Sequence, residues 1–65
     1  MFIRKYRKKK KMSQADLALL VGVSQSMVAK WENGINYPTV EVLIKLADLF
    51  GCTIDELVRG EKKDA

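Results

Sequence analysis

Apolar residues recur every three or four positions through most of the chain, and no segment alternates apolar and polar residues as a half-buried strand would. The clearest helical period lies in the second half, at Val40, Leu43, Leu46, Ala47 and Phe50. It predicts a helix that begins near Thr39 and ends at Phe50, before Gly51. Together with the residues that begin and end helices along the rest of the chain, this pattern predicts an all-α protein of five short helices.

A weaker period predicts a first helix from Phe2 to about Lys10. Ile3 and Tyr6 fall on one face of this helix, and Lys10 lies on the same face. Isolated helices of this length are marginal in water. The first helix must therefore be held by docking on the rest of the protein.

A last short helix is predicted near the end of the chain. Thr53 and Glu56 have the spacing of a capping box, and Gly60 stops the helix. The apolar residues of this helix are Ile54, Leu57 and Val58. Residues 61–65 form a polar tail that is expected to fray.

Two further helices are predicted in the middle of the chain, joined by a short turn. Ser13 precedes an apolar run with Asp16 three residues later, the spacing of a capping box, and Gly22 ends this helix. Its buried stripe is expected to consist of Leu17, Ala18, Leu20 and Val21. Ser24 caps the next helix, which runs over Gln25–Asn33.

The residue types at the turn between these two helices suit a crossed pair. The helices of a helix-turn-helix cross at about 90–120°. Ala18 is small where the helices approach closely, and Gly22 tolerates the positive φ of the turn. Apolar residues that can fill the angle between the helices are Leu17, Val21, Val23, Val28 and Trp31. Because all these features are in register, they favour a helix-turn-helix over a generic helical hairpin.

Composition and charge narrow the class of protein further. The chain has 65 residues, 48% of them apolar and 31% charged, which suits one small globular domain without a membrane span. Residues 1–30 carry eight Lys or Arg against one acid, whereas residues 31–65 carry four against seven. This asymmetry favours a polyanion partner for the first half, although a solvated basic helix would have the same composition.

The chain has few residues suited to catalysis or to metal binding. Histidine is absent and Cys52 is the only cysteine, so we expect no disulfide within the chain, no zinc site and no nucleophile paired with a base. A glycine-rich phosphate loop is also lacking. We therefore predict a protein that is not an enzyme and has no cofactor and no metal. Without a signal peptide or membrane segment, it is expected to be cytoplasmic.

Five stretches of the chain carry a resemblance to a known family. They are residues 12–18 (MSQADLA), 21–26 (VGVSQS), 30–34 (KWENG), 37–39 (YPT) and 45–47 (KLA). In these stretches the chain resembles the phage lambda repressor and Cro family of helix-turn-helix proteins, also called the xenobiotic-response-element type. The resemblance implies a compact five-helix fold and dimers that bind two-fold symmetric operators. Lys11 departs from the pattern, because many relatives have glycine there, so the bend before Met12 is expected to differ.

By this resemblance the helix that begins at Gln25 is the recognition helix, whose first side chains contact base edges in the major groove. The candidate base contacts are Gln25, Ser26, Ala29 and Lys30. Glutamine can bind adenine through two hydrogen bonds, Ala29 can contact a thymine methyl group, and Lys30 can reach a guanine or a phosphate. Ordinary surface polarity at a helix start is the alternative for Gln25 and Ser26.

A second group of polar residues is expected to contact DNA phosphates and so to position the domain. This group consists of Gln14, Ser24, Asn33, Asn36, Tyr37 and Lys10. Gln14 opens a helix, whose free N–H groups and partial positive charge suit a phosphate oxygen. Two alternatives stay open: Gln14 could be an ordinary exposed residue, and Asn33 could simply cap the recognition helix.

The resemblance also implies an ion pair between the first helix and the recognition helix. Members of the family often pair an arginine with a glutamate in these helices, and Arg7 and Glu32 stand at the matching positions. We expect this pair to be partly buried and to orient the recognition helix. Trp31 is expected in the core and not against a base. Packing roles are also expected for Met12, Met27 and Cys52.

Together these patterns predict a single DNA-binding domain over residues 1–65, with its core at about residues 3–60. Its predicted function is that of a sequence-specific transcriptional regulator, most often a repressor, which binds double-stranded operator DNA. A homodimer is expected, at least on DNA, joined by the last two helices. The alternative is a protein-interaction module, such as an antitoxin or partner-binding regulator, that uses the acidic second half. The sequence would also suit the N-terminal piece of a longer repressor.

Overall fold

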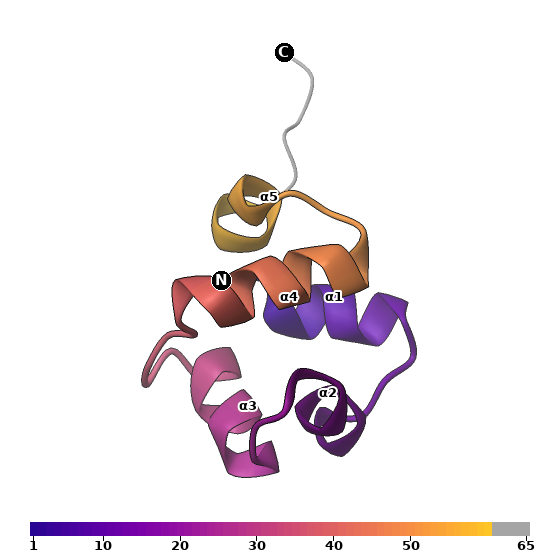
Figure 1. Ribbon diagram of the computed structural model, residues 1–65, viewed down its shortest axis with the longest axis vertical. Helices are drawn as coiled ribbons and strands as arrows, with labels where there is room; N and C mark the ends of the chain where they lie inside the picture. The colour runs from indigo at the N-terminus through magenta and orange to yellow at the C-terminus, as the bar shows by residue number, and fades with distance from the viewer. Residues whose placement is uncertain (61–65) are drawn as a thin grey trace.

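The computed structural model describes residues 1–60, and its five helices occur where the sequence predicts them (Figure 1). They are α1 (Ile3–Lys9), α2 (Gln14–Val21), α3 (Gln25–Glu32), α4 (Val40–Phe50) and α5 (Ile54–Arg59). None of the described residues is in a strand, so the predicted all-α, five-helix class is confirmed. The polar tail expected at residues 61–65 lies outside the described residues.

Side-chain hydrogen bonds mark the beginning of four helices. The side-chain hydroxyl of each capping residue accepts a hydrogen bond from the backbone N–H three residues later in the chain. The capping residues are Ser13, Ser24, Thr39 and Thr53. At Ser13 and Thr53 the acidic side chain of Asp16 or Glu56 also accepts the backbone N–H of the cap, so both predicted capping boxes are present. These bonds satisfy N–H groups that have no partner within the helix, and they fix where each helix begins.

The turn between α2 and α3 sets these two helices across each other. Gly22 has a φ of +76°, in the left-handed region that glycine adopts without a Cβ penalty. The N–H groups of Gly22 and Val23 both donate to the carbonyl of Ala18, at 2.9 and 3.0 Å, and so close the end of α2. Figure 1 looks nearly along α2 while α3 lies across the view, which is the crossed arrangement that the turn residues predict.

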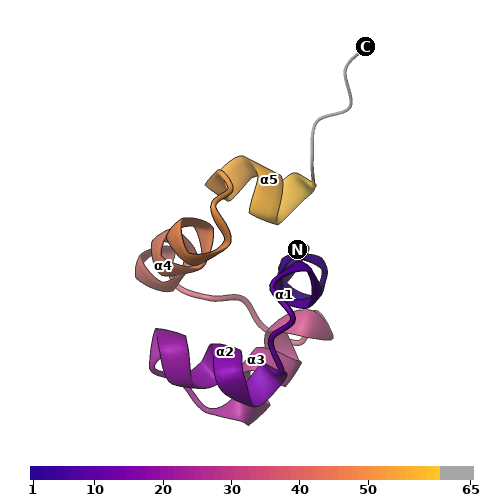
Figure 2. The same cartoon turned by 90° about the vertical axis from the view of Figure 1, so that its right-hand side faces the viewer.

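Helix α1 lies in the middle of the molecule. Figures 1 and 2 place α5 on one side of it and α2 and α3 on the other. The N–H of Phe2 donates to the carbonyl of Leu57 at 2.8 Å, and the ring of Tyr6 stacks on that of Phe50 with 5.8 Å between centroids. This docking holds a helix that is too short to be stable alone.

All five helices contribute to one buried core. Its members are Ile3, Tyr6, Leu17, Ala18, Val21, Val28, Trp31, Leu46, Phe50 and Leu57. Trp31 is 4% exposed, which confirms its predicted place in the core. The side chains of Met12, Met27 and Cys52 are partly buried and pack against this core, Cys52 being half-buried and not fully enclosed. No described helix is long and apolar enough to cross a membrane.

One predicted core position, Leu20, is wrong. Leu20 is 59% exposed, because residues two apart on a helix project in nearly opposite directions and Ala18 faces the core. Val40 is 69% exposed, because the first residues of α4 that pack on the core are Val42 and Leu43. The short α5 buries one of its three apolar residues fully, whereas more than a third of the surface is exposed at both Ile54 and Val58.

The bend between α1 and α2 contains a left-handed residue. Lys11 has a φ of +56° and is the one residue other than glycine with a positive φ in the described part of the chain. By the family resemblance noted in the sequence, many relatives have glycine at this position. The bend therefore imposes on a lysine a conformation that glycine adopts with less strain.

Candidate nucleic-acid interface

One face of α3 is buried and the other is open to solvent. Val28 and Trp31 are 0% and 4% exposed, and they fix the inner face of the helix on the core. The side chains of Gln25, Ser26 and Lys30 are exposed, and Ala29 is half-buried at the edge of the same outer face. The predicted base contacts therefore lie together on the accessible side of this helix.

Two serines meet at the beginning of α3. The Oγ atom of Ser24 accepts the N–H of Met27 at 3.1 Å and lies 3.1 Å from the Oγ of Ser26. Either hydroxyl can be the donor between them, since each carries one proton and two lone pairs. The contact holds Ser26 close to the cap, whereas Gln25 extends from the exposed start of the helix.

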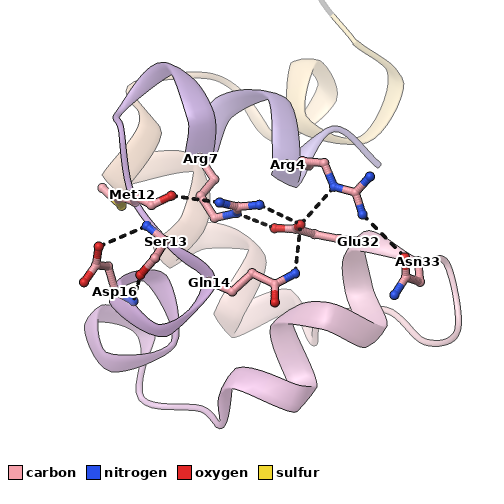
Figure 3. Close-up of polar contacts among 8 residues, drawn as sticks. All are labelled: Arg4, Arg7, Met12, Ser13, Gln14, Asp16, Glu32 and Asn33. Carbon is pink, nitrogen blue, oxygen red and sulfur yellow. Dashed lines mark hydrogen bonds and ion pairs between the residues drawn. The ribbon is translucent and has the colours of Figure 1, made fainter.

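The carboxylate of Glu32, at the end of α3, is the centre of a buried polar cluster (Figure 3). Arg7 donates to it from Nε at 2.7 Å and from Nη2 at 3.0 Å, and its Nη1 donates to the carbonyl of Met12 at 2.8 Å. The side chain of Glu32 is 0% exposed and that of Arg7 is 11% exposed. The structure thus brings together the pair that the resemblance implies, and this bidentate pair links α1 to α3.

Two further side chains donate to the same carboxylate. Gln14 donates from Nε2 to Oε1 of Glu32 at 3.2 Å, and Arg4 donates from Nε at 3.1 Å. The Nη2 of Arg4 also donates to Oδ1 of Asn33 at 3.4 Å. Sequence reasoning missed Arg4, although its position three residues before Arg7 places both arginines on one face of α1.

The charges of this cluster stabilise one another. Burial by itself raises the pKa of Glu32, but the hydrogen bonds from Arg7, Gln14 and Arg4 lower it, and the net pKa lies below the ordinary value. The hydrogen bond to Glu32 raises the pKa of Arg7. Both groups therefore stay charged at neutral pH, and the two arginines leave the cluster with a net positive charge.

The remaining candidate phosphate contacts differ in their exposure. Asn33 is exposed and follows α3 directly, with its backbone N–H donating to the carbonyl of Ala29 at 3.0 Å. Lys10, the residue after α1, is exposed, and Tyr37 is 69% exposed. Asn36 is half-buried, and its Nδ2 lies 3.6 Å from the sulfur of Met27. Asn36 is therefore less accessible to a DNA backbone than Asn33, Lys10 and Tyr37.

The described residues contain no group of three or more Cys, Asp or Glu side chains that could hold a metal ion. The exposed polar groups gathered around α3 are amides, hydroxyls and cationic side chains. Such groups donate hydrogen bonds to anions and to base edges. The geometry thus defines a small helix-turn-helix domain in which the outer face of α3, the second helix of the motif, is exposed.

Comparison with known proteins agrees with this class. The helix-turn-helix family matches residues 3–57, and the chain belongs to it. A solved structure of the P22 c2 repressor, bound to a synthetic operator in the presence of Tl⁺, is similar with a TM-score of 0.84 and 39% identity. The similarity covers 91% of this chain and 89% of that one. The resemblance to the lambda repressor and Cro type is confirmed by these matches.

Several regulators of known name are similar in sequence. The regulator AnsR of Bacillus subtilis is 46% identical over 57 residues, which cover 88% of this chain and 49% of AnsR. The activator BcrR of Enterococcus faecalis is 38% identical over 92% of this chain, and the repressor protein C2 of Salmonella phage P22 is 39% identical over 91%. The match covers 29% of BcrR and 27% of C2, so the chain spans about a quarter to a half of these relatives' lengths.

Proposed function

We propose that this chain is a sequence-specific transcriptional regulator that binds double-stranded operator DNA, and that it acts as a repressor in the cytoplasm. The observation that carries the proposal is the exposed N-terminal end of α3, held crosswise on α2 with Gln25 and Ser26 accessible. A helix held in this way can enter the major groove while the preceding helix crosses the backbone. The similar P22 c2 structure, which contains operator DNA, supports the proposal.

In this proposal the outer face of α3 selects the sequence. Gln25 binds an adenine through N6 and N7, Ala29 packs against a thymine methyl group, and Lys30 reaches a guanine or a phosphate. Ser26 contacts the neighbouring base edge with its own hydroxyl, which is also within hydrogen-bond distance of the Ser24 hydroxyl. One bidentate contact of this kind is worth roughly 1–3 kcal/mol of discrimination between bases.

The phosphate contacts position the domain without selecting sequence. An amide nitrogen carries two protons, so Gln14 can donate one to Glu32 and the other to a phosphate oxygen. The remaining contacts in the proposal come from Ser24, Asn33, Asn36, Tyr37 and Lys10. Asn36 needs a side-chain rotation to take part, because it is half-buried against Met27.

A homodimer on DNA completes the proposal. One domain of this size contacts few base pairs, whereas two copies on half-sites one helical turn apart double the contacts. Apolar side chains on α4 and α5 that are partly exposed, and so available to a second copy, are Ile44, Ile54 and Val58. We place the dimer contact there, with residues 1–65 as one DNA-binding domain in each copy.

The proposal is tested by selecting bound duplexes from a random pool and measuring affinities for the selected site. We expect Gln25→Ala to lose discrimination at one base position, by roughly 1–3 kcal/mol, while Gln14→Ala weakens all sequences alike. The logarithm of the binding constant should fall against the logarithm of salt concentration, with a slope of about −0.9 per contacted phosphate.

Two results would contradict this assignment. Selection that yields no preferred sequence would remove sequence-specific recognition, and binding that hardly responds to salt would favour a protein partner.

The dimer is tested separately, by sedimentation and by a footprint on the selected site. Two symmetric protected half-sites are expected, whereas protection of one half-site would remove the dimer from the proposal.

A further inference from the structure

We propose that Arg4 is a positioning residue that orients the side chain of Asn33 for contact with the DNA backbone, an inference that rests on the proposed function. Arg4 lies on α1, and Asn33 is the first residue after α3. The two residues are far apart in the sequence, and the fold brings them together at the end of the recognition helix (Figure 3).

The guanidinium of Arg4 joins a buried anchor to an exposed amide. Its Nε donates to Oε1 of Glu32 at 3.1 Å, and its Nη2 donates to Oδ1 of Asn33 at 3.4 Å. The side chain of Glu32 is fully buried and is held from the other side by Arg7. Because the donors of a guanidinium lie in one rigid plane, the bond to Glu32 fixes the direction in which Nη2 points.

This arrangement decides which way the Asn33 amide faces. A guanidinium has donors and no acceptor, so Asn33 must turn its oxygen toward Arg4. Its NH₂ group then points away from Arg4. A phosphate oxygen only accepts hydrogen bonds, and the orientation that Arg4 imposes is therefore the one that can bind a phosphate. Without Arg4 the amide is free to rotate and to present its oxygen to the DNA, which repels it.

The exposure of Arg4 separates this role from that of Arg7. The side chain of Arg4 is 52% exposed, whereas that of Arg7 is 11% exposed and also holds the Met12 carbonyl. Removing Arg4 leaves the bidentate pair of Arg7 and Glu32 in place. We therefore expect its loss to affect the affinity for DNA more than the stability of the fold.

The test is a double-mutant cycle on the selected operator with Arg4→Ala, Asn33→Ala and the double variant. Lys8→Ala is the control, because it removes the same charge from an exposed position on α1. We expect Arg4→Ala to weaken binding about fivefold more than Lys8→Ala does, a loss on the scale of one hydrogen bond. Once the Lys8→Ala effect is subtracted, the double variant should bind no more weakly than Asn33→Ala. Arg4→Lys should not restore affinity, because one ammonium lacks the planar fork.

Three results would overturn the inference. Additive losses in the cycle would show that Arg4 does not act through Asn33. A salt slope about 0.9 smaller for Arg4→Ala than for Lys8→Ala would show that Arg4 contacts a phosphate itself. A large fall in the unfolding midpoint with unchanged affinity of the folded fraction would show a structural role alone. If the wild-type protein fails to bind any duplex, the proposed function fails as well, whereas binding with an additive cycle removes only the role of Arg4.

Discussion

Lys11 carries local backbone strain at the bend between the first two helices. Its φ of +56° lies in the left-handed region, which costs an ordinary residue roughly 1–2 kcal/mol. Glycine would relieve this strain but would lose more conformational entropy on folding, by about 0.4–1 kcal/mol. The difference between the two terms favours glycine at this position.

We therefore expect Lys11→Gly to raise the free energy of unfolding by about 0.5–1 kcal/mol. Urea denaturation monitored by Trp31 fluorescence measures the change. The matched control is Lys10→Gly, because Lys10 has an ordinary φ of −85° and the substitution removes the same charge. The control should lower stability. Equal effects of the two substitutions would mean that the strain at Lys11 has no energetic weight.

The sequence predicts some residues of the binding face and misses others. Gln25, Ser26 and Lys30 are predicted on the binding face because the family resemblance makes the helix that begins at Gln25 the recognition helix. Arg4 was missed because its partners are supplied by another helix. A sequence period shows which face of a helix is polar, but it does not show which side chain from elsewhere approaches that face.

At the scale of elements, Glu32 ties the recognition helix to the two helices before it. Donors reach its carboxylate from α1 and α2, and Arg7 continues the connection to the carbonyl of Met12 at the bend. Because the pair is buried, removing Glu32 leaves the Arg7 guanidinium without a counter-charge, and removing Arg7 takes the bidentate partner away from Glu32. The orientation of α3 therefore depends on a polar contact as well as on the apolar contacts of Val28 and Trp31.

A double-mutant cycle with Arg7→Ala and Glu32→Gln should report this dependence. We expect either single change to cost about 3–5 kcal/mol of unfolding free energy and the pair to be strongly coupled. The exposed ion pair of Asp55 and Arg59, with 3.2 Å between N and O, is the control and should couple by only about 0.2–1 kcal/mol. A coupling as small as that of the control would disprove the orienting role.

Helix positions were predictable because their signals are local. The capping boxes at Ser13 and Thr53 and the left-handed Gly22 and Gly51 fix the ends of helices within a few residues of sequence. The burial of individual residues was less predictable. Leu20 and other apolar residues at the margins of a stripe are buried only if a neighbouring helix extends over them, and sequence spacing does not report how far it extends.

At the scale of the whole molecule, the dependence of stability on pH should be simple. The chain has no histidine, so no side chain has an ordinary pKa between pH 5 and 8. Among residues 1–60, two carboxylates have lowered pKa values in the folded protein. Asp16 owes this to its hydrogen bonds with Ser13, and Glu32 owes it to donors that outweigh the effect of burial.

Stability should therefore be nearly constant above about pH 5 and should fall as the pH drops through and below 4.5, the ordinary pKa of glutamate. The unfolded chain takes up a proton at Glu32 more readily than the folded protein does, so acid favours unfolding. Glu32→Gln should lower stability at pH 7 and make the fall of stability below pH 4.5, the acid limb of the curve, less steep. Urea denaturation at a series of pH values measures both effects. An acid limb unchanged by the substitution would mean that Glu32 titrates normally in the folded protein.

The division of α3 into an inner and an outer face has a consequence for the evolution of such a protein. Val28 and Trp31 secure the helix, whereas Gln25 and Lys30 project from the accessible side. Exchange of the outer residues should leave folding almost untouched, so variants with new operator preferences can arise without passing through unfolded intermediates. One scaffold can in this way diversify into many regulators, each changed at a few solvent-facing positions.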